Sequence, residues 1–265
     1  MQKQLKNRQN RQEIIQKELE WHDKEAHRRL PLDHFLYAPP AFDGLSNFCL
    51  EFLQAKDGEL VLDMGCGEGK HTIDLARNNL TVVSVDLSHT QLLLAKEMAA
   101  QLLPDAEILF VQANAEELPF AQNSFRIIFG KAIIHHLDEK LSIAEVKRLL
   151  KPQGRATFSE PLAHHPLIWL GRKLTPKLRT QDEHPLTIQE MSRFGQAFGT
   201  KEVDTFFLFA PLAYVVRALP RGEMAFQKLH RFLAKVDKQI FNAIGSAKRL
   251  AWYGVVNVTN THGVP

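Results

Sequence analysis

Three glycines at alternate positions, Gly65, Gly67 and Gly69, follow the apolar run "ELVLDM" and precede a helix-prone segment. Glycine allows a sharp backbone bend and lets a ligand lie against the main chain. The N-terminus of a helix adds free N–H groups and a partial positive charge. The spacing therefore predicts a ligand-binding turn between a buried strand and a helix.

Two familiar glycine loops do not match this turn. The dinucleotide fingerprint G-x-G-x-x-G, counted from Gly65, would need a glycine where Lys70 stands, which disfavours an NAD-dependent oxidoreductase. A Walker A loop would need a glycine at Met64 and a Ser or Thr after the lysine, and neither is present. The remaining pattern is G-x-G-x-G with an acid two residues earlier, which here is Asp63.

A second acid strengthens this pattern. Asp86 ends the apolar run "TVVSVD", 23 residues after Asp63. In open α/β sheets, ligands bind beyond the carboxyl ends of the strands. A carboxylate in that position can accept hydrogen bonds from both hydroxyl groups of a ribose.

Short apolar runs and amphipathic segments alternate along the chain. Strands are expected at "ELVLDM", "TVVSVD", "AEILFVQA", "SFRIIFG" and "GRATFSE", with helices between them. This alternation indicates parallel β-α-β units in one twisted sheet. Residues 203–209 and 251–259 are expected to form the last two strands, with about 40 residues inserted between them, about 210–248, that include a long amphipathic helix.

These runs predict a helical arm or lid at 1–44 and a main domain at 45–265. The arm is charged and helix-prone, and its later part is rich in aromatic side chains that could close over a ligand. The chain begins with a basic segment that lacks the apolar core of a secretory signal, and no apolar run reaches the roughly 18 residues of a membrane span.

The glycine loop with its neighbours resembles motif I of the class I S-adenosylmethionine-dependent methyltransferases. The segment "NAEELPFAQNSFRIIFGKAIIHHL", residues 114–137, is similar to later motifs of their small-molecule branch, which includes quinone-biosynthesis enzymes (methyltransferase type 11). The resemblance covers about residues 58–160. It implies a Rossmann-like, doubly wound α/β fold with a seven-stranded sheet, mostly parallel with an antiparallel last strand, and S-adenosyl-L-methionine as cofactor.

The resemblance also implies roles for individual residues. Asp63 would help to hold the cofactor's amino group, Asp86 would bind the ribose, and Asn114 would accept from the adenine amine in place of the usual aspartate. Tyr37 would reach the cofactor's carboxylate, with core packing as an equally weighted alternative. The other residues expected at the cofactor are Gly65, Cys66, Gly67, Leu87, Ala115 and Lys131.

Candidates for catalysis follow from the strand ends. Methyl transfer from a sulfonium depends mainly on alignment and on exclusion of water, and an oxygen or nitrogen acceptor also needs a base. His135 follows the fourth strand, Glu160 ends the fifth, and His184 lies in a polar stretch beyond it. Each has a packing or helix-start role as its alternative. No metal site is expected, because the adjacent His135 and His136 should point in different directions.

Composition bounds the partners. The net charge is +3, with 33 basic and 30 acidic residues, so nucleic acid is not an expected partner. The 2 cysteines suit a reducing cytoplasm. The apolar and basic residues at 206–240 indicate either a solvated face or peripheral contact with a membrane. The sequence does not indicate an oligomeric state.

The sequence thus predicts methyl transfer to a small, hydrophobic or lipid-like acceptor. Two alternatives stay open: an RNA or protein methyltransferase, and a regulatory protein that binds S-adenosylmethionine without turnover. The absence of an Asn/Asp-Pro-Pro-Tyr type motif after the fourth strand, where "FGKAII" stands, weighs against methylation of amino groups on bases.

Overall fold

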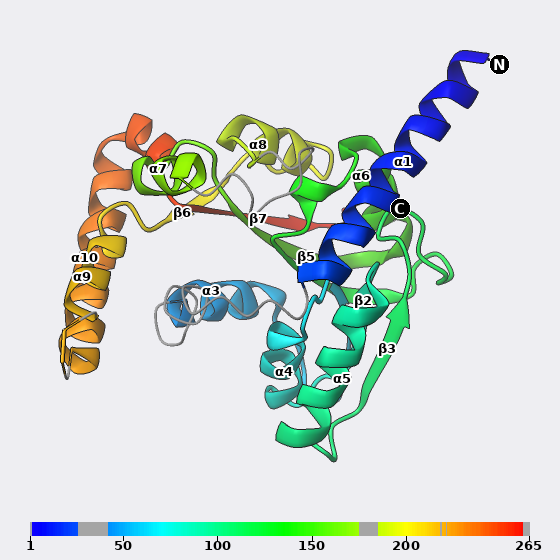
Figure 1. Cartoon of the computed structure of the whole chain (residues 1–265), viewed down its shortest axis with the longest axis horizontal. Coiled ribbons are helices and arrows are strands. Elements are labelled where there is room, and N and C mark those ends of the chain that lie inside the picture. The colour runs from blue at the N-terminus through cyan, green and yellow to red at the C-terminus, as the bar shows by residue number, and fades with distance from the viewer. Residues whose placement is uncertain (1, 26–41, 175–184, 218, 221, 262–265) are drawn as a thin grey trace.

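The fold is built on one seven-stranded sheet with the strand order β3-β2-β1-β4-β5-β7-β6. The computed structural model describes residues 2–25, 42–174, 185–217, 219–220 and 222–261 (Figure 1). The strands are β1 (Leu60–Met64), β2 (Thr81–Asp86), β3 (Ile108–Gln112), β4 (Phe125–Lys131), β5 (Leu150–Pro161), β6 (Asp204–Phe206) and β7 (Tyr253–Thr259).

The first five strands run parallel, and β7 runs antiparallel to both β5 and β6. The predicted α/β class, the strand number and the antiparallel last strand are therefore confirmed. The sixth strand is shorter than expected, because only Asp204–Phe206 pairs with β7. Parallel order places the carboxyl ends of β1, β2 and β4 at one edge, where ligands bind in folds of this kind.

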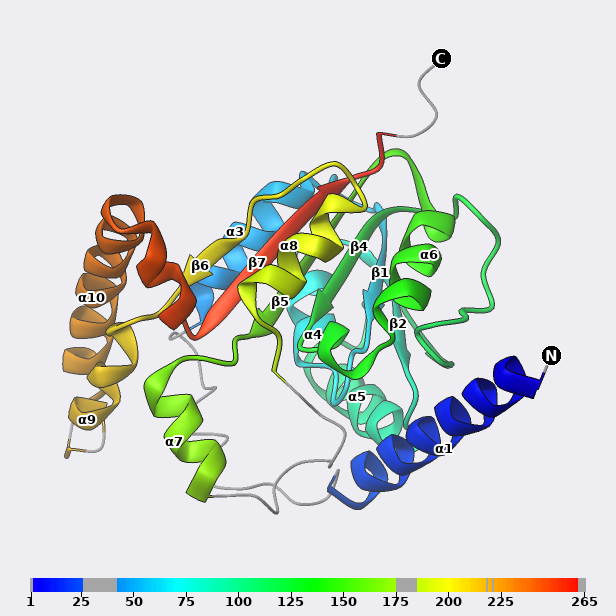
Figure 2. The ribbon, with the colours of Figure 1, turned by 90° about the horizontal axis from the view of Figure 1, so that it is seen from above.

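Helices cover both faces of the sheet (Figure 2). One buried layer includes side chains of α3 (Asp43–Leu53), α4 (Lys70–Arg77) and the insertion. The other includes side chains of α6 (Glu139–Leu149) and α8 (Ile188–Gln196). The short central strands are buried on both sides, which explains why they read as continuous apolar runs.

The insertion between β6 and β7 is helical, as expected. It comprises η3 (Ala210–Ala213), α9 (Tyr214–Arg217), α10 (Glu223–Ala243) and η4 (Gly245–Leu250). Buried Asp237 of α10 accepts hydrogen bonds from the N–H groups of Leu208, Phe209 and Ala210 at 2.8, 2.9 and 3.0 Å. These bonds fasten α10 to the chain that leaves β6. A further helix, α7 (Pro166–Leu174), follows β5.

The N-terminal helix α1 (Gln2–Glu25) stands apart from the sheet at its first residues and approaches α5 (His89–Leu102) with its last ones (Figures 1 and 2). None of the α1 side chains that the structure describes belongs to the two core layers. Polar side chains, described below, hold it in place.

Candidate functional site

The three glycines of the turn after β1 have different surroundings. All have positive φ, at 76°, 52° and 83° for Gly65, Gly67 and Gly69. A Cβ on Gly65 would lie 2.6 Å from the side chain of Ile133, and one on Gly69 would lie 2.6 Å from Cβ of Ala95. A Cβ on Gly67 would meet no atom within 4 Å among the described residues. Gly67 is therefore the glycine whose Cα faces open space.

Asp86 is joined to this turn directly. Its Oδ2 accepts from the Gly67 N–H at 2.8 Å, and its Oδ1 accepts from the Ser88 N–H at 2.9 Å. Ser88 also caps α5, because its Oγ accepts from the Gln91 N–H at 3.1 Å. The predicted ribose acid is half-buried beside the open glycine, and each of its oxygens has a second lone pair for a ligand hydroxyl.

Asp63 lies behind the turn rather than in it. Its carboxyl group is buried, and Oδ2 accepts from Thr72 Oγ1 at 2.6 Å, which in turn accepts from Ser84 Oγ at 2.9 Å. Burial raises the pKa of Asp63 to about 7. The geometry indicates that Asp63 ties β1 to the first turn of α4, whereas the sequence predicted contact with the cofactor's amino group.

Asn114 lies in the loop after β3, two residues beyond Gln112, which pairs with Asp86. Its Oδ1 accepts from the Glu116 N–H at 3.0 Å, and its carbonyl accepts from the Glu117 N–H at 3.0 Å. The amide oxygen is therefore already engaged in a turn, and only its second lone pair remains for an adenine amine.

The other residues expected at the cofactor vary in accessibility. Leu87 is half-buried beside Asp86, whereas Ala115 and Cys66 are buried. The Cys66 Sγ lies 3.6 Å from the Gly67 carbonyl, and burial raises the pKa of its thiol. Cys66 can thus contribute main-chain contacts, but its thiol is not poised to react.

A small polar cavity lies beside the turn. It has a volume of about 50 Å³ and is lined by Phe42, Asp43, Ser46, Lys70, His71, Asp74 and Lys131. The Lys131 ammonium lies 4.8 Å from the Phe42 ring centre and 5.8 Å from that of Tyr253. Burial, with the nearby charge of Lys70, lowers the pKa of Lys131 to about 8. Burial lowers the pKa of His71 to about 4, with Lys131 adding to the effect.

The loop after β4 is held by Glu160. This fully buried carboxylate accepts from the N–H groups of Ile133 and Ile134, each at 2.8 Å, and pairs with Nδ1 of His135 at 2.6 Å. Ile133 packs over Gly65, so Glu160 supports the glycine turn through its hydrogen bond to Ile133. Its exposure of 0% does not fit the substrate contact that the sequence predicted.

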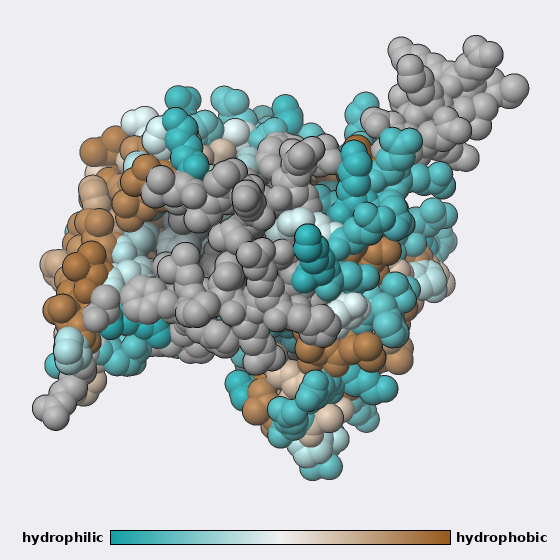
Figure 3. All heavy atoms as spheres, in the orientation of Figure 1, coloured by the Kyte–Doolittle hydropathy of each residue, from teal (hydrophilic) through white to brown (hydrophobic). Residues whose placement is uncertain are grey.

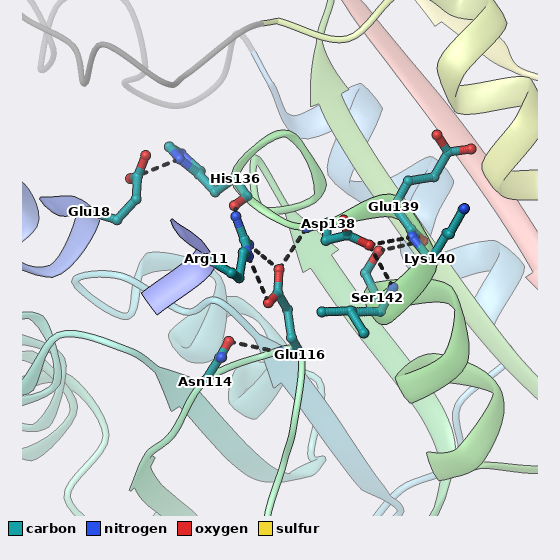
Figure 4. Close-up of polar contacts among 10 residues, drawn as sticks. Arg11, Glu18, Asn114, Glu116, His136, Asp138, Glu139, Lys140 and Ser142 are labelled. Atoms are coloured by element: carbon teal, nitrogen blue, oxygen red, sulfur yellow. Dashed lines mark hydrogen bonds and ion pairs between the residues drawn. The ribbon is translucent and has the colours of Figure 1, made fainter. Parts of the chain in front are cut away.

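The arm reaches the same edge of the sheet, and the sequence did not reveal these contacts. Arg11 forms an ion pair with Glu116 and donates to the His136 carbonyl at 3.3 Å (Figure 4). Asp23 accepts from the Ser88 hydroxyl. Helix α1 therefore contacts Glu116, two residues beyond Asn114, and Ser88, two residues beyond Asp86. Tyr37 and His184 lie outside the described residues.

The glycine turn and its neighbours lie at the carboxyl ends of the parallel strands of a Rossmann-like sheet. Residues 61–154 match the model of a family described as a methyltransferase domain. That segment holds the glycine turn, Asp86, Asn114 and the loop after β4.

Curated relatives match the same region. An O-methyltransferase of Penicillium expansum is 30% identical over 116 residues, which are 43% of this chain and 42% of that protein. The 2-phytyl-1,4-naphtoquinone methyltransferase of Trichormus variabilis is 34% identical over 113 residues, 41% of this chain and 49% of that protein. The chain thus matches less than half the length of each of these relatives.

A solved structure extends the likeness in fold. The geranyl diphosphate C-methyltransferase of Streptomyces coelicolor, crystallised with Mg²⁺, geranyl diphosphate and S-adenosyl-L-homocysteine, superimposes with a TM-score of 0.54. It is 16% identical and covers 82% of this chain and 79% of its own. At that identity the likeness concerns the fold alone.

Proposed function

We propose that this protein binds S-adenosyl-L-methionine at the carboxyl ends of β1 and β2 and transfers its methyl group to a small molecule. The observation that carries the proposal is the pairing of Gly67 with Asp86. Open main chain and a carboxylate lie side by side, as a nucleoside with an amino-acid tail requires. Of the relatives that share this segment, one is named as an O-methyltransferase and another as a methyltransferase of 2-phytyl-1,4-naphtoquinone.

The cofactor supplies an activated methyl group on a sulfonium, so the chain has to bind, align and exclude water. Asp86 would accept from the ribose hydroxyls, and Asn114 would accept from the adenine amine. The polar end of the cofactor would lie over Gly67 and the N-terminus of α4, where the helix dipole favours a carboxylate.

His135 and Glu160 serve as positioning residues in this proposal. Their pairing fixes the loop after β4, and Ile133 of that loop packs against the glycine turn. The His135 side chain is 5% exposed. A role in holding the methyl-transfer geometry therefore suits it better than direct proton abstraction.

The small cavity beside the N-terminus of α4 offers the ammonium group of Lys131 to an anionic ligand group, while Asp43 and Asp74 balance the charges of Lys70 and Lys131. A carboxylate of the cofactor or an anionic group of the acceptor would favour the charged form of Lys131, which burial disfavours.

The acceptor is hydrophobic in our proposal, and the insertion faces a membrane surface. None of the described helices is long and apolar enough to cross a membrane. Val215, Met224 and Phe232 are nevertheless 72, 75 and 61% exposed on α9 and α10. Figure 3 shows hydrophobic side chains gathered along that edge. Exposed Lys228, Arg231 and Lys235 accompany them, as on helices that lie on anionic lipid.

Calorimetric titration with S-adenosyl-L-homocysteine, followed by methylation assays on a panel of prenylated and phenolic acceptors, tests the proposal. We expect binding with one site per chain and transfer to at least one hydrophobic acceptor. If S-adenosyl-L-homocysteine does not bind, the proposed methyltransferase activity is rejected. Binding without turnover on any acceptor would favour the regulatory alternative.

A further inference from the structure

Three side chains from two distant parts of the sequence converge at the arm. Glu18 and His22 are one helical turn apart on α1, and His136 ends the 3-10 turn η1 (Ile134–His136) after β4. Figure 4 shows Glu18 pointing at His136. One ligand atom from each of the three residues lies within 4.8 Å of the others.

Two of the three distances in the cluster match edges of a metal tetrahedron. Glu18 Oε2 lies 3.5 Å from His22 Nε2 and 3.2 Å from His136 Nδ1. Zinc bonds of about 2.0–2.2 Å to imidazole nitrogen or carboxylate oxygen give a tetrahedral edge of about 3.3–3.6 Å. The His136 Nδ1 atom is buried and makes no hydrogen bond of acceptable geometry within the described part of the chain.

The ligand set is chemically selective. Two imidazoles and one carboxylate form a common three-residue set for zinc, and such a set leaves a fourth position open. The pair Glu18 and His22 on one helical face follows the same i, i+4 logic as two ligands on a zinc-binding helix. The Glu18 and His136 side chains are 9 and 15% exposed, so water competes little for them.

We propose that Glu18, His22 and His136 bind one divalent transition-metal ion, best matched by zinc, which fastens α1 to the loop after β4. The adjacent His135 turns to Glu160 instead, so the two histidines of "HHL" do not chelate together. The metal stabilises α1 between Ser88 and Glu116, across the edge at which the proposed cofactor lies. Metal binding itself does not depend on the proposed activity.

The test uses the full, tag-free chain stripped with chelator and then titrated with zinc, and in parallel with cobalt as a spectroscopic probe. We expect one ion per chain and the intense visible bands of tetrahedral cobalt. The ring of Trp21 lies 5.0 Å from that of His22, so its fluorescence should change on binding. His22→Asn and Glu18→Gln should each weaken zinc binding by more than the roughly 100-fold that loss of a supporting group costs.

His164→Asn is the matched control, because His164 is exposed and outside the cluster. His136→Asn alters a half-buried residue of the loop after β4 and could disturb that loop. The two arm variants, His22→Asn and Glu18→Gln, leave the sheet and its loops unchanged, so they decide the outcome. Hydrogen exchange should show zinc-dependent protection of α1 in wild type and not in His22→Asn. Absence of stoichiometric zinc, or equal binding in the arm variants, overturns the site. Binding without added protection of α1 overturns the fastening.

Discussion

The main-chain N–H of Gly67 donates to Oδ2 of Asp86 at 2.8 Å, so the glycine turn and the acid of the next strand form one unit. Such preorganisation lowers the cost of ordering a site when the ligand arrives. Asp86 also accepts from the Ser88 N–H, which ties the unit to the N-cap of α5.

Asp86→Asn should reduce affinity for S-adenosyl-L-homocysteine by about 10- to 100-fold, because hydrogen bonds to a charged acceptor are worth about 1.5–3 kcal/mol. Isothermal titration measures the change. Glu97→Gln, an exposed acid on α5, is the control and should bind as wild type. Equal affinity of Asp86→Asn and wild type would contradict the ribose assignment.

Gly67→Ala and Gly69→Ala form a matched pair: the first should affect cofactor binding and the second the free energy of unfolding. Alanine at 67 strains the backbone by about 1 kcal/mol and projects into open space, so it should mainly impair cofactor binding. Alanine at 69 would collide with Ala95, so it should lower the free energy of unfolding by about 1–3 kcal/mol. Urea unfolding and cofactor titration separate the two. Two variants with the same profile would argue against Gly67 as the ligand-facing glycine.

The sequence predicted the sheet and the position of the glycine turn well, for a physical reason. Strands buried on both faces must read as short apolar runs, and a glycine turn beside two acids has few other uses. Gly65, Gly67 and Asp86 lie together as expected. The division of labour among the glycines could not be predicted, because it depends on Ile133 and Ala95, which meet the turn only in three dimensions.

Lys131→Met should raise the free energy of unfolding at neutral pH by about 1–3 kcal/mol, since each unit of pKa shift is worth about 1.4 kcal/mol and the contacts with aromatic rings offset part of it. Burial lowers the pKa of Lys131 from 10.5 to about 8. Between these values the unfolded chain holds a proton that the folded chain has lost, so wild-type stability rises with pH. The advantage of the variant should therefore be largest below pH 8 and vanish above about 10.5.

Chemical denaturation of both proteins across pH 7–10.5 checks this prediction, with Lys96→Met on the exposed face of α5 as the control. The same variant should lose affinity for anionic ligands of the cavity. A stability difference that does not change with pH would show that burial does not penalise the charge.

Glu160→Gln should weaken cofactor binding about tenfold, the order of effect of losing a charge-assisted hydrogen bond. The loss of charge weakens its hold on Ile133, Ile134 and His135, and Ile133 supports the glycine turn. Titration with S-adenosyl-L-homocysteine and thermal unfolding measure the two effects. Reduced turnover with unchanged cofactor affinity would instead favour the direct substrate contact that the sequence suggested.

The double variant Met224→Ser/Phe232→Ser should lose association with anionic vesicles in a flotation assay while retaining binding of S-adenosyl-L-homocysteine. The two side chains are exposed on the insertion and do not belong to either core layer. Leu93→Ser, which removes a 54% exposed leucine from α5, is the control. If wild type itself stays with the unbound protein, the membrane proposal falls and the hydrophobic acceptor must be reached from solution.

The position of the arm could not be predicted from the sequence. A charged helix can be recognised, but its position depends on single polar contacts such as Arg11 with Glu116 and Asp23 with Ser88. No periodic pattern encodes such contacts. The contacts of Glu160 are a related case: its position at the strand end was predicted, but the loop N–H groups from which it accepts could not be predicted from the sequence.

Both ends of the insertion lie in neighbouring antiparallel strands, and Phe206 pairs directly with Tyr253 where the inserted chain leaves and returns. A short hairpin could therefore replace everything between these two residues without breaking the sheet register. Protein engineers can therefore exchange this stretch as a module while β6 and β7 stay paired.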